Sequence, residues 1–194
     1  VPGPDEADRL WLAGRDALIR AGYEHYEVSN FARPGRRCLH NIRYWRMENW
    51  IGAGSAGSGT IINEKIDEKI DGGEGAPAPG SGGPGGRRTS YAPDAGAFTE
   101  DPSRCLRTED LERDTVLRET IMMGFRYRGG PDPALFLRRF GQTIEETIPQ
   151  TLARWSAFLR PGKTALSEEG LLFLNRFTLD AFGELDASRR NGGG

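Results

Sequence analysis

A fifteen-residue stretch rich in glycine and proline most constrains how this chain can fold. Residues 72–86 contain eight Gly and three Pro, and such a run buries too little apolar area to offset the entropy lost on ordering. Just before it, the tetrapeptide EKID at 64–67 is repeated at 68–71. We therefore predict a flexible insertion and connecting segment over 63–106, between a domain at 1–62 and a domain at 107–186, with a disordered tail at 187–194.

The composition excludes several classes of protein. Hydrophobic residues make up 37% of the 194 residues, which suffices for one ordinary core or two small ones. The formal net charge of −2 gives no general attraction to nucleic acid. No window approaches the ~18 apolar residues of a membrane span, and no secretory signal is visible. Since the chain starts at Val1, we expect a soluble, cytoplasmic fragment.

The first part of the chain has the pattern of an α/β unit. Apolar and small residues follow helical spacing from Pro4, and Gly22 stands where a glycine would end the helix. Residues 25–31 suit a strand that closes at Pro34-Gly35. Polar residues such as Glu27 and Asn30 then fall at the carboxyl end of that strand, where α/β folds place their sites.

The second part has the pattern of a small α-helical domain. We predict a helix capped by Thr108, a second from Asp132-Pro133, a third over 145–158 and a fourth capped by Ser167. Leu117, Ile121 and Phe125 are spaced as one face of the first of these helices.

Residues 33–46 contain five arginines and no acid. Guanidinium groups pair with carboxylates or phosphates in a bidentate manner, which indicates an anionic small molecule, whereas a solvated basic loop is the other interpretation. His40 is a candidate for an iron ligand, a proton shuttle or a satisfied buried polar group. Tyr44-Trp45 suit either a core or the face of a flat cofactor.

A second glycine cluster covers residues 52–59. It is followed by neither the Gly-Lys-Ser/Thr of a phosphate loop nor the helix of a dinucleotide motif. Close approach of a ligand to the backbone and a tight turn between two short strands are both compatible with it.

Two motifs carry a resemblance to a known family. GYEHYEVSNFARPG at 22–35 and HNIRYW at 40–45, followed by WIGAGSA at 50–56, resemble the HemW-like radical SAM heme chaperones, which are relatives of oxygen-independent coproporphyrinogen III oxidase. RRTSY at 87–91, ETIMMGFR at 119–126 and ALSEEG at 165–170 are similar to later elements of that family.

The resemblance implies a fold and a set of cofactors. Residues 1–62 would be the closing α/β units of a radical SAM partial barrel of the TIM type, followed by the small helical C-terminal domain. The family's CxxxCxxC motif, which holds a [4Fe–4S] cluster that binds S-adenosylmethionine, would lie in an N-terminal radical SAM segment outside this chain. Cys38 and Cys105 cannot replace it, so we expect no catalysis by this chain alone.

Two functions are compatible with this resemblance. One is a heme chaperone that binds heme and delivers it to acceptor proteins, with arginines on the propionates and His40 or Tyr44 at the iron; HNxxYW favours this branch. The other is radical oxidation of coproporphyrinogen in heme biosynthesis. The candidate heme- or cofactor-binding residues are Glu27, Asn30, Arg36, Arg37, His40, Asn41, Arg43, Tyr44, Trp45, Gly52 and Gly54.

Overall fold

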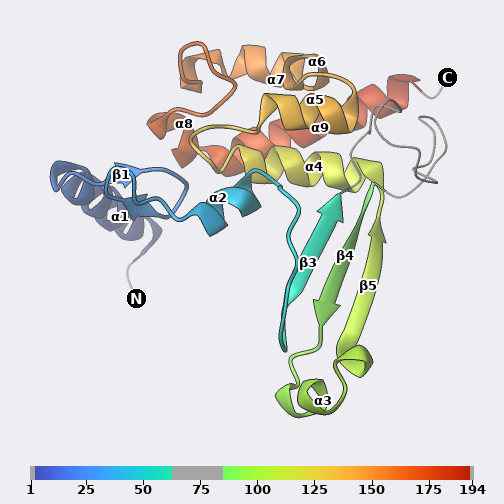
Figure 1. The fold of residues 1–194 in the computed structure, drawn as a ribbon. Coiled ribbons are helices and arrows are strands. Elements are labelled where there is room, and N and C mark those ends of the chain that lie inside the picture. Colours follow the sequence, from blue (N-terminus) through green and yellow to red (C-terminus); the bar gives the residue numbers. More distant parts are fainter. Residues whose placement is uncertain (1–2, 63–84, 193–194) are drawn as a thin grey trace.

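The computed structural model describes residues 3–62 and 85–192. These residues form an N-terminal unit of helices and a short hairpin, a three-stranded sheet, and a bundle of helices (Figure 1). Most of the glycine- and proline-rich stretch lies outside the described residues. The expected mixture of an α/β part with an α part is confirmed, whereas a partial barrel is not, because every strand pairing among the described residues is antiparallel.

The N-terminal unit begins with α1 (Pro4–Arg20), which has proline in its first turn. Gly22 follows it with φ of +83°, a conformation that glycine adopts without strain, so the predicted end of this helix is confirmed. The predicted strand over 25–31 is wrong. The chain turns back at Ser29-Asn30, and β1 (Glu24–His25) and β2 (Phe31–Ala32) pair as a short antiparallel hairpin.

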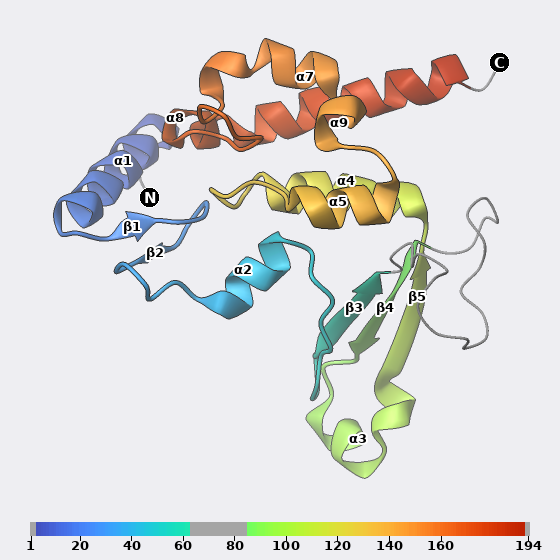
Figure 2. The same ribbon diagram turned by 45° about the horizontal axis from the view of Figure 1, so that its top comes forward.

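The three-stranded sheet was not predicted from the sequence. After α2 (Leu39–Trp45), strands β3 (Ser58–Ile62), β4 (Gly86–Tyr91) and β5 (Leu106–Leu111) pair in that order. The sheet extends away from the helices and carries α3 (Ala95–Glu100) and a 3-10 turn (Pro102–Cys105) at its far end (Figures 1 and 2). Residues 85–106, predicted to be flexible, are therefore ordered structure.

Thr108 lies inside β5 and is not a helix cap, so that prediction is wrong. Its strand is held by pairing with β4, in which Thr89 faces Thr108. Asp110 also accepts a hydrogen bond from the Nε of Arg87 on the opposite strand, at 2.7 Å. Glu109 and Asp110, which follow Thr108, form cross-strand ion pairs with Arg88 and Arg87.

The bundle follows directly, and two of its predicted helix starts are confirmed. Asp132 caps α5 by accepting from Leu135 N at 2.9 Å, and Ser167 caps α8 by accepting from Gly170 N at 3.0 Å. The elements are α4 (Arg113–Gly124), α5 (Pro133–Phe140), α6 (Ile144–Thr147), α7 (Pro149–Arg154), a 3-10 turn (Ser156–Phe158), α8 (Glu168–Leu172) and α9 (Leu174–Gly192).

Two helices predicted as continuous are broken. Ile148 leaves the helical conformation immediately before Pro149, as the residue before a proline tends to do, and this separates α6 from α7. Phe173 separates α8 from α9. Because α9 continues to Gly192, the predicted disordered tail is wrong for residues 187–192.

The principal core lies within the bundle. Phe125 and Phe177 are fully buried there, with ring centroids 4.4 Å apart. The N-terminal unit is joined to the bundle by main-chain hydrogen bonds, in which Val28 N donates to Arg126 O at 3.1 Å and Arg128 N donates to Tyr26 O at 3.2 Å. This junction holds the motif-bearing residues in a fixed position on the bundle.

Candidate functional site

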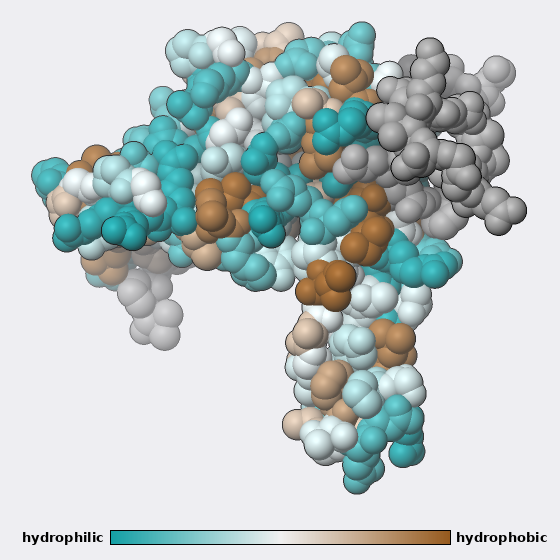
Figure 3. All heavy atoms as spheres, in the orientation of Figure 1, coloured by the Kyte–Doolittle hydropathy of each residue, from teal (hydrophilic) through white to brown (hydrophobic). Residues whose placement is uncertain are grey.

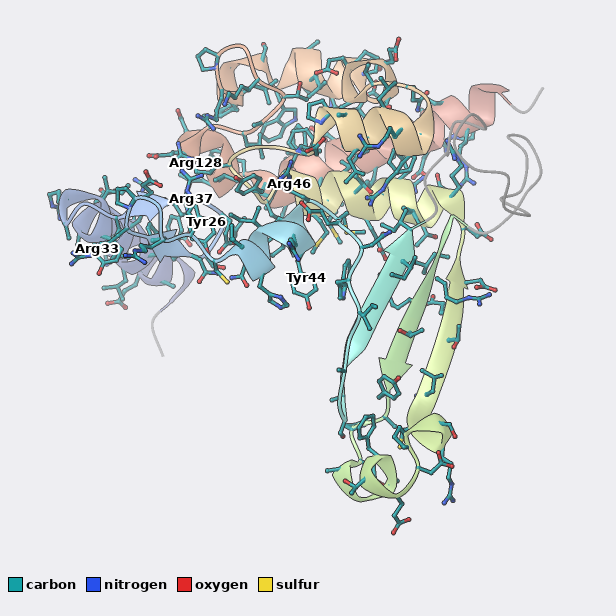
Figure 4. The ribbon with its side chains drawn as sticks, in the orientation of Figure 1. Tyr26, Arg33, Arg37, Tyr44, Arg46 and Arg128 are labelled. Carbon is teal, nitrogen blue, oxygen red and sulfur yellow. The ribbon has the colours of Figure 1, made fainter. Side chains whose placement is uncertain are left out.

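A row of three aromatic rings lies along α2. His40 and Tyr44 are one helical turn apart, and their rings meet edge to face with centroids 4.6 Å apart. The ring of Trp50 meets that of Tyr44 in the same manner at 4.8 Å. Tyr44 points away from the bundle in Figure 4. The HNxxYW spacing thus brings together two predicted residues, His40 and Tyr44, and adds Trp50, which was not among the candidates.

Exposed aliphatic side chains flank this row. Leu39 is 72% exposed and Ile51 is 85% exposed, and His40 is exposed as well. In Figure 3 hydrophobic side chains gather over the start of α2 and beside β3. We call these residues, Leu39, His40, Tyr44, Trp50 and Ile51, the α2 face. Exposed apolar groups beside polar ones are typical of a binding surface.

The C-terminal end of α2 is fixed to the bundle by charged groups. Arg46 forms an ion pair with Asp132, the residue that caps α5, and Figure 4 shows Arg46 on the side of α2 toward the bundle. Burial raises the pKa of the Asp132 carboxyl, but the N–H of Leu135 and the Arg46 guanidinium outweigh it, so this pKa lies below its ordinary value. The buried Arg139 also donates from Nη1 to Met47 O at 2.6 Å.

The glycine cluster at 52–59 folds back on itself next to the α2 face. Trp50 and Thr60 exchange main-chain hydrogen bonds of 3.0 and 2.9 Å. A Cβ atom on Gly52 would lie 2.3 Å from the backbone of Ser58, and one on Gly59 would lie 2.7 Å from Gly52 N. Contact between two stretches of backbone accounts for these glycines, which favours the tight-turn interpretation. Ligand contact at Gly52 or Gly54 stays a prediction.

The five arginines do not converge on one site. Arg36 and Arg43 are exposed. Arg33 lies over the ring of Tyr23 and Arg37 pairs with Glu24 at 2.8 Å. Arg43 and Arg46 instead share Glu48, at 3.6 and 3.5 Å, and Arg46 also pairs with Asp132. An anion held jointly by this group is therefore not favoured by the geometry.

The remaining candidates occupy the hairpin and the inner side of α2. Glu27 is fully buried, and neither of its carboxylate oxygens has a hydrogen-bond partner among the described residues. The half-buried Trp45 likewise has a buried Nε1 without such a partner. Asn30 is exposed at the hairpin turn, and Asn41 is half-buried. Glu27 and the Nε1 of Trp45 thus lie within the fold, away from solvent.

His25 is a buried residue that sequence reasoning did not single out. It is 3% exposed, its ring stacks on Phe31 at 4.5 Å, and its Nε2 lies 3.2 Å from Val28 O. Since a carbonyl only accepts, Nε2 donates there. Burial lowers the pKa of His25 below its ordinary value, and Arg128 lowers it further, against the Val28 carbonyl, which raises it. The local sequence pattern around His25 does not distinguish a buried histidine from an exposed one.

The residues present do not fit an iron–sulfur cluster. The chain has two cysteines, of which Cys38 is exposed and Cys105 is buried, and three cysteinyl ligands are needed for the cluster that the resemblance implies. Within residues 3–62 and 85–192, no three His, Cys, Asp or Glu side chains are grouped so as to hold a metal ion. No helix in this part of the chain has the length and apolar character to cross a membrane.

Comparison with known proteins confirms the predicted resemblance. The chain is 39% identical over 66 residues to "Heme chaperone HemW" of Synechocystis, an alignment that covers 34% of this chain and 16% of that protein. It is 28% identical over 160 residues to "Heme chaperone HemW" of Lactococcus lactis, which covers 78% of this chain and 37% of the relative. The mouse "Radical S-adenosyl methionine domain-containing protein 1, mitochondrial" is 31% identical over 133 residues, or 65% of this chain and 26% of the relative.

These relatives are much longer than the stretches that match. The chain spans between 16% and 37% of the lengths of the three relatives described. No family model matches the chain, and no solved structure matches it. The similarity to HemW and to radical SAM proteins therefore rests on curated sequences and on the motifs of the α2 face and the hairpin.

Proposed function

We propose that this chain is part of a HemW-like heme chaperone and that heme binds at the α2 face. The observation that carries the proposal is the row of the exposed His40 and the half-buried Tyr44 and Trp50, which displays one imidazole beside aromatic edges and aliphatic side chains. Relatives to which this chain is similar bear the name heme chaperone.

The chemistry of this face suits a porphyrin. An imidazole nitrogen is a common axial ligand of heme iron, and His40 is accessible on the first turn of α2. Leu39 and Ile51 offer apolar area to the macrocycle. Arg43 is 69% exposed on the same helix and has only a long ion pair, at 3.6 Å with Glu48, so it is the best placed of the predicted arginines to meet a propionate.

The complete protein would also contain a radical SAM segment with a [4Fe–4S] cluster and S-adenosylmethionine, and would pass heme to acceptor proteins. An apolar strip on α1 supports a neighbour of this kind, since Leu10 is 58% exposed and Trp11, Leu18 and Ile19 are exposed as well. Heme transfer without coproporphyrinogen turnover by the complete protein would support the chaperone branch; robust turnover would support the oxidase branch instead.

Hemin titration of this chain, followed by the Soret band, tests the heme site. His40→Ala is expected to weaken heme binding at least tenfold and to alter the Soret spectrum, because the axial ligand is lost. Tyr44→Phe keeps the ring edge and should bind as the wild-type chain does. Arg43→Ala should weaken binding about threefold, as expected for one exposed charge contact.

His25→Phe is the matched control, because it removes the other of the two histidines from a buried position. It should leave heme affinity unchanged in a chain whose circular dichroism spectrum shows that it is folded. If His40→Ala bound heme with wild-type affinity and spectrum, the proposed site would be wrong.

A further inference from the structure

A cavity separate from the proposed heme site lies where the N-terminal unit meets the bundle. Its volume is about 480 Å³, and its walls come from β1, the loop before α2, the segment after α4, the turn after the second 3-10 helix and the start of α8. In Figure 4 the labelled Tyr26, Arg37 and Arg128 lie together in this region, whereas Tyr44 is on the other side of α2.

Positive charge dominates the lining of this cavity. Four cationic side chains line it, namely Arg37, Arg128, Arg160 and Lys163, against the two carboxylates of Glu24 and Glu168. His25 also lines the cavity, and its lowered pKa makes it neutral at pH 7.5. The walls therefore carry two positive charges in excess.

Both carboxylates are already paired with a cation. Arg37 Nη2 lies 2.8 Å from Glu24 Oε2, and Arg128 Nη1 lies 2.6 Å from Glu168 Oε1. The unbalanced charges are therefore those of Arg160 and Lys163.

Arg160 and Lys163 lie in a single turn, in which Lys163 N donates to Arg160 O at 3.1 Å. The Arg160 guanidinium donates only to a main-chain carbonyl, Arg128 O, at 2.6 Å, and the Lys163 ammonium has no hydrogen bond or ion pair with any residue that the structure describes. The turn thus presents two cations that no carboxylate of residues 3–62 or 85–192 neutralises through an ion pair.

Two buried nitrogen atoms of the lining also lack partners. Arg128 Nε and His25 Nδ1 are inaccessible to solvent, and neither has a hydrogen-bond partner within the described part of the chain. His25 as a whole is 3% exposed. Because the ring proton of His25 is on Nε2, Nδ1 is an acceptor, and neither it nor Arg128 Nε is open to the cavity. An anion in the cavity would therefore be held by the cations of the turn and not by these two atoms.

We propose that this cavity binds a small phosphate monoester. The phosphate group carries about two negative charges at neutral pH, which match the two unbalanced cations of the turn. Guanidinium groups bind phosphate oxygens through paired hydrogen bonds, and an ammonium adds a point charge. The half-buried rings of Tyr23 and Tyr127 also line the cavity and offer apolar area to the organic part of the ester.

Isothermal titration calorimetry with phenyl phosphate and phenyl sulfate at pH 7.5 and physiological salt tests the proposal. The two probes have nearly the same shape, but the phosphate carries about two charges and the sulfate one. Phenyl phosphate is expected to bind at least tenfold more tightly than phenyl sulfate. The double variant Arg160→Gln with Lys163→Gln should weaken phenyl phosphate binding at least tenfold.

Lys163→Gln alone should weaken binding threefold or more, and it decides the question if the double variant fails to fold, because the Lys163 side chain has no polar contact in the described structure to lose. Arg107→Gln is the matched control, since it removes one exposed positive charge on β5 and should leave the affinity unchanged. Equal affinity for the two probes, wild-type affinity in Lys163→Gln, or no phenyl phosphate binding at millimolar concentration would overturn the proposal.

Discussion

The bundle and the N-terminal unit differ in how far their apolar side chains are buried and in whether their buried polar atoms have partners. In the bundle, Phe125 and Phe177 are fully buried against each other, and the helix starts are capped by side chains such as Thr143 and Ser167. In the N-terminal unit four large apolar side chains of α1 are exposed, and buried atoms of His25, Glu27 and Trp45 lack partners among the described residues.

This difference distinguishes residues that stabilise the fold from residues that have another role. Each buried polar group without a partner costs about 1–3 kcal/mol, and a fold retains such groups mainly where a ligand or partner uses them. Three residues with such groups, His25, Glu27 and Trp45, lie in the unit that carries the two family motifs, and Arg128 lies where the bundle meets that unit. We infer that its residues are placed for binding and that the bundle supplies the rigid support.

Core truncation should produce the largest contrast between the two regions. Phe125→Ala in the bundle is expected to lower the free energy of unfolding by about 3–5 kcal/mol, because it leaves a cavity in a close-packed core. Leu10→Ala on the exposed side of α1 should change it by less than about 0.5 kcal/mol. Urea denaturation followed by circular dichroism measures both. A loss above 2 kcal/mol in Leu10→Ala would show that α1 is packed more closely than the structure indicates.

Replacing one carboxylate in each region should change stability in opposite directions. Glu27→Met removes a buried carboxylate without a partner and keeps similar volume, so we expect unfolding to require about 1–3 kcal/mol more. Glu184 instead accepts from Gln150 N at 2.8 Å and Thr151 N at 2.7 Å at the start of α7. Glu184→Met should therefore cost about 1–2 kcal/mol.

The same denaturation experiment compares these variants, with the wild-type chain as the reference. If Glu27→Met destabilised the chain by as much as Glu184→Met, the Glu27 carboxylate would have to be satisfied within the fold, and the contrast between the two regions would be lost.

The sequence revealed features that depend on neighbouring residues. The end of α1 at Gly22, the start of a helix near Asp132-Pro133 and the cap Ser167 were predicted, because a side chain and the main-chain N–H groups two or three positions later decide where a helix starts. His40 and Tyr44 were singled out from the sequence, but the helix that places them on one side, α2, was not predicted.

Features that depend on distant pairing were missed. Thr108 lies in a strand because β4 pairs with it, although its local sequence resembles a helix start. Arg128 and His25 are 103 positions apart, yet the guanidinium donates to His25 O at 3.0 Å. Helix or strand preference is weak compared with tertiary packing at such positions, so neither the sheet nor the cavity could be found from local patterns.

The smallest expected effect is a change in the free energy of unfolding with pH, which comes from the buried His25 and not from the exposed His40. The folded-state pKa of His25 is lowered, chiefly by burial, whereas in the unfolded chain it has its ordinary value of about 6.5. As pH falls from 7.5 to 5.5 the unfolded state takes up a proton that the folded state does not, so the free energy of unfolding should fall by up to about 1 kcal/mol.

His25→Phe should remove this dependence of stability on pH, and His40→Phe, at an exposed position, should retain it. With two histidines in the chain, their proton resonances can be assigned from these variants. A His25 resonance that titrates at the ordinary midpoint would contradict the burial on which the difference between the two regions partly rests.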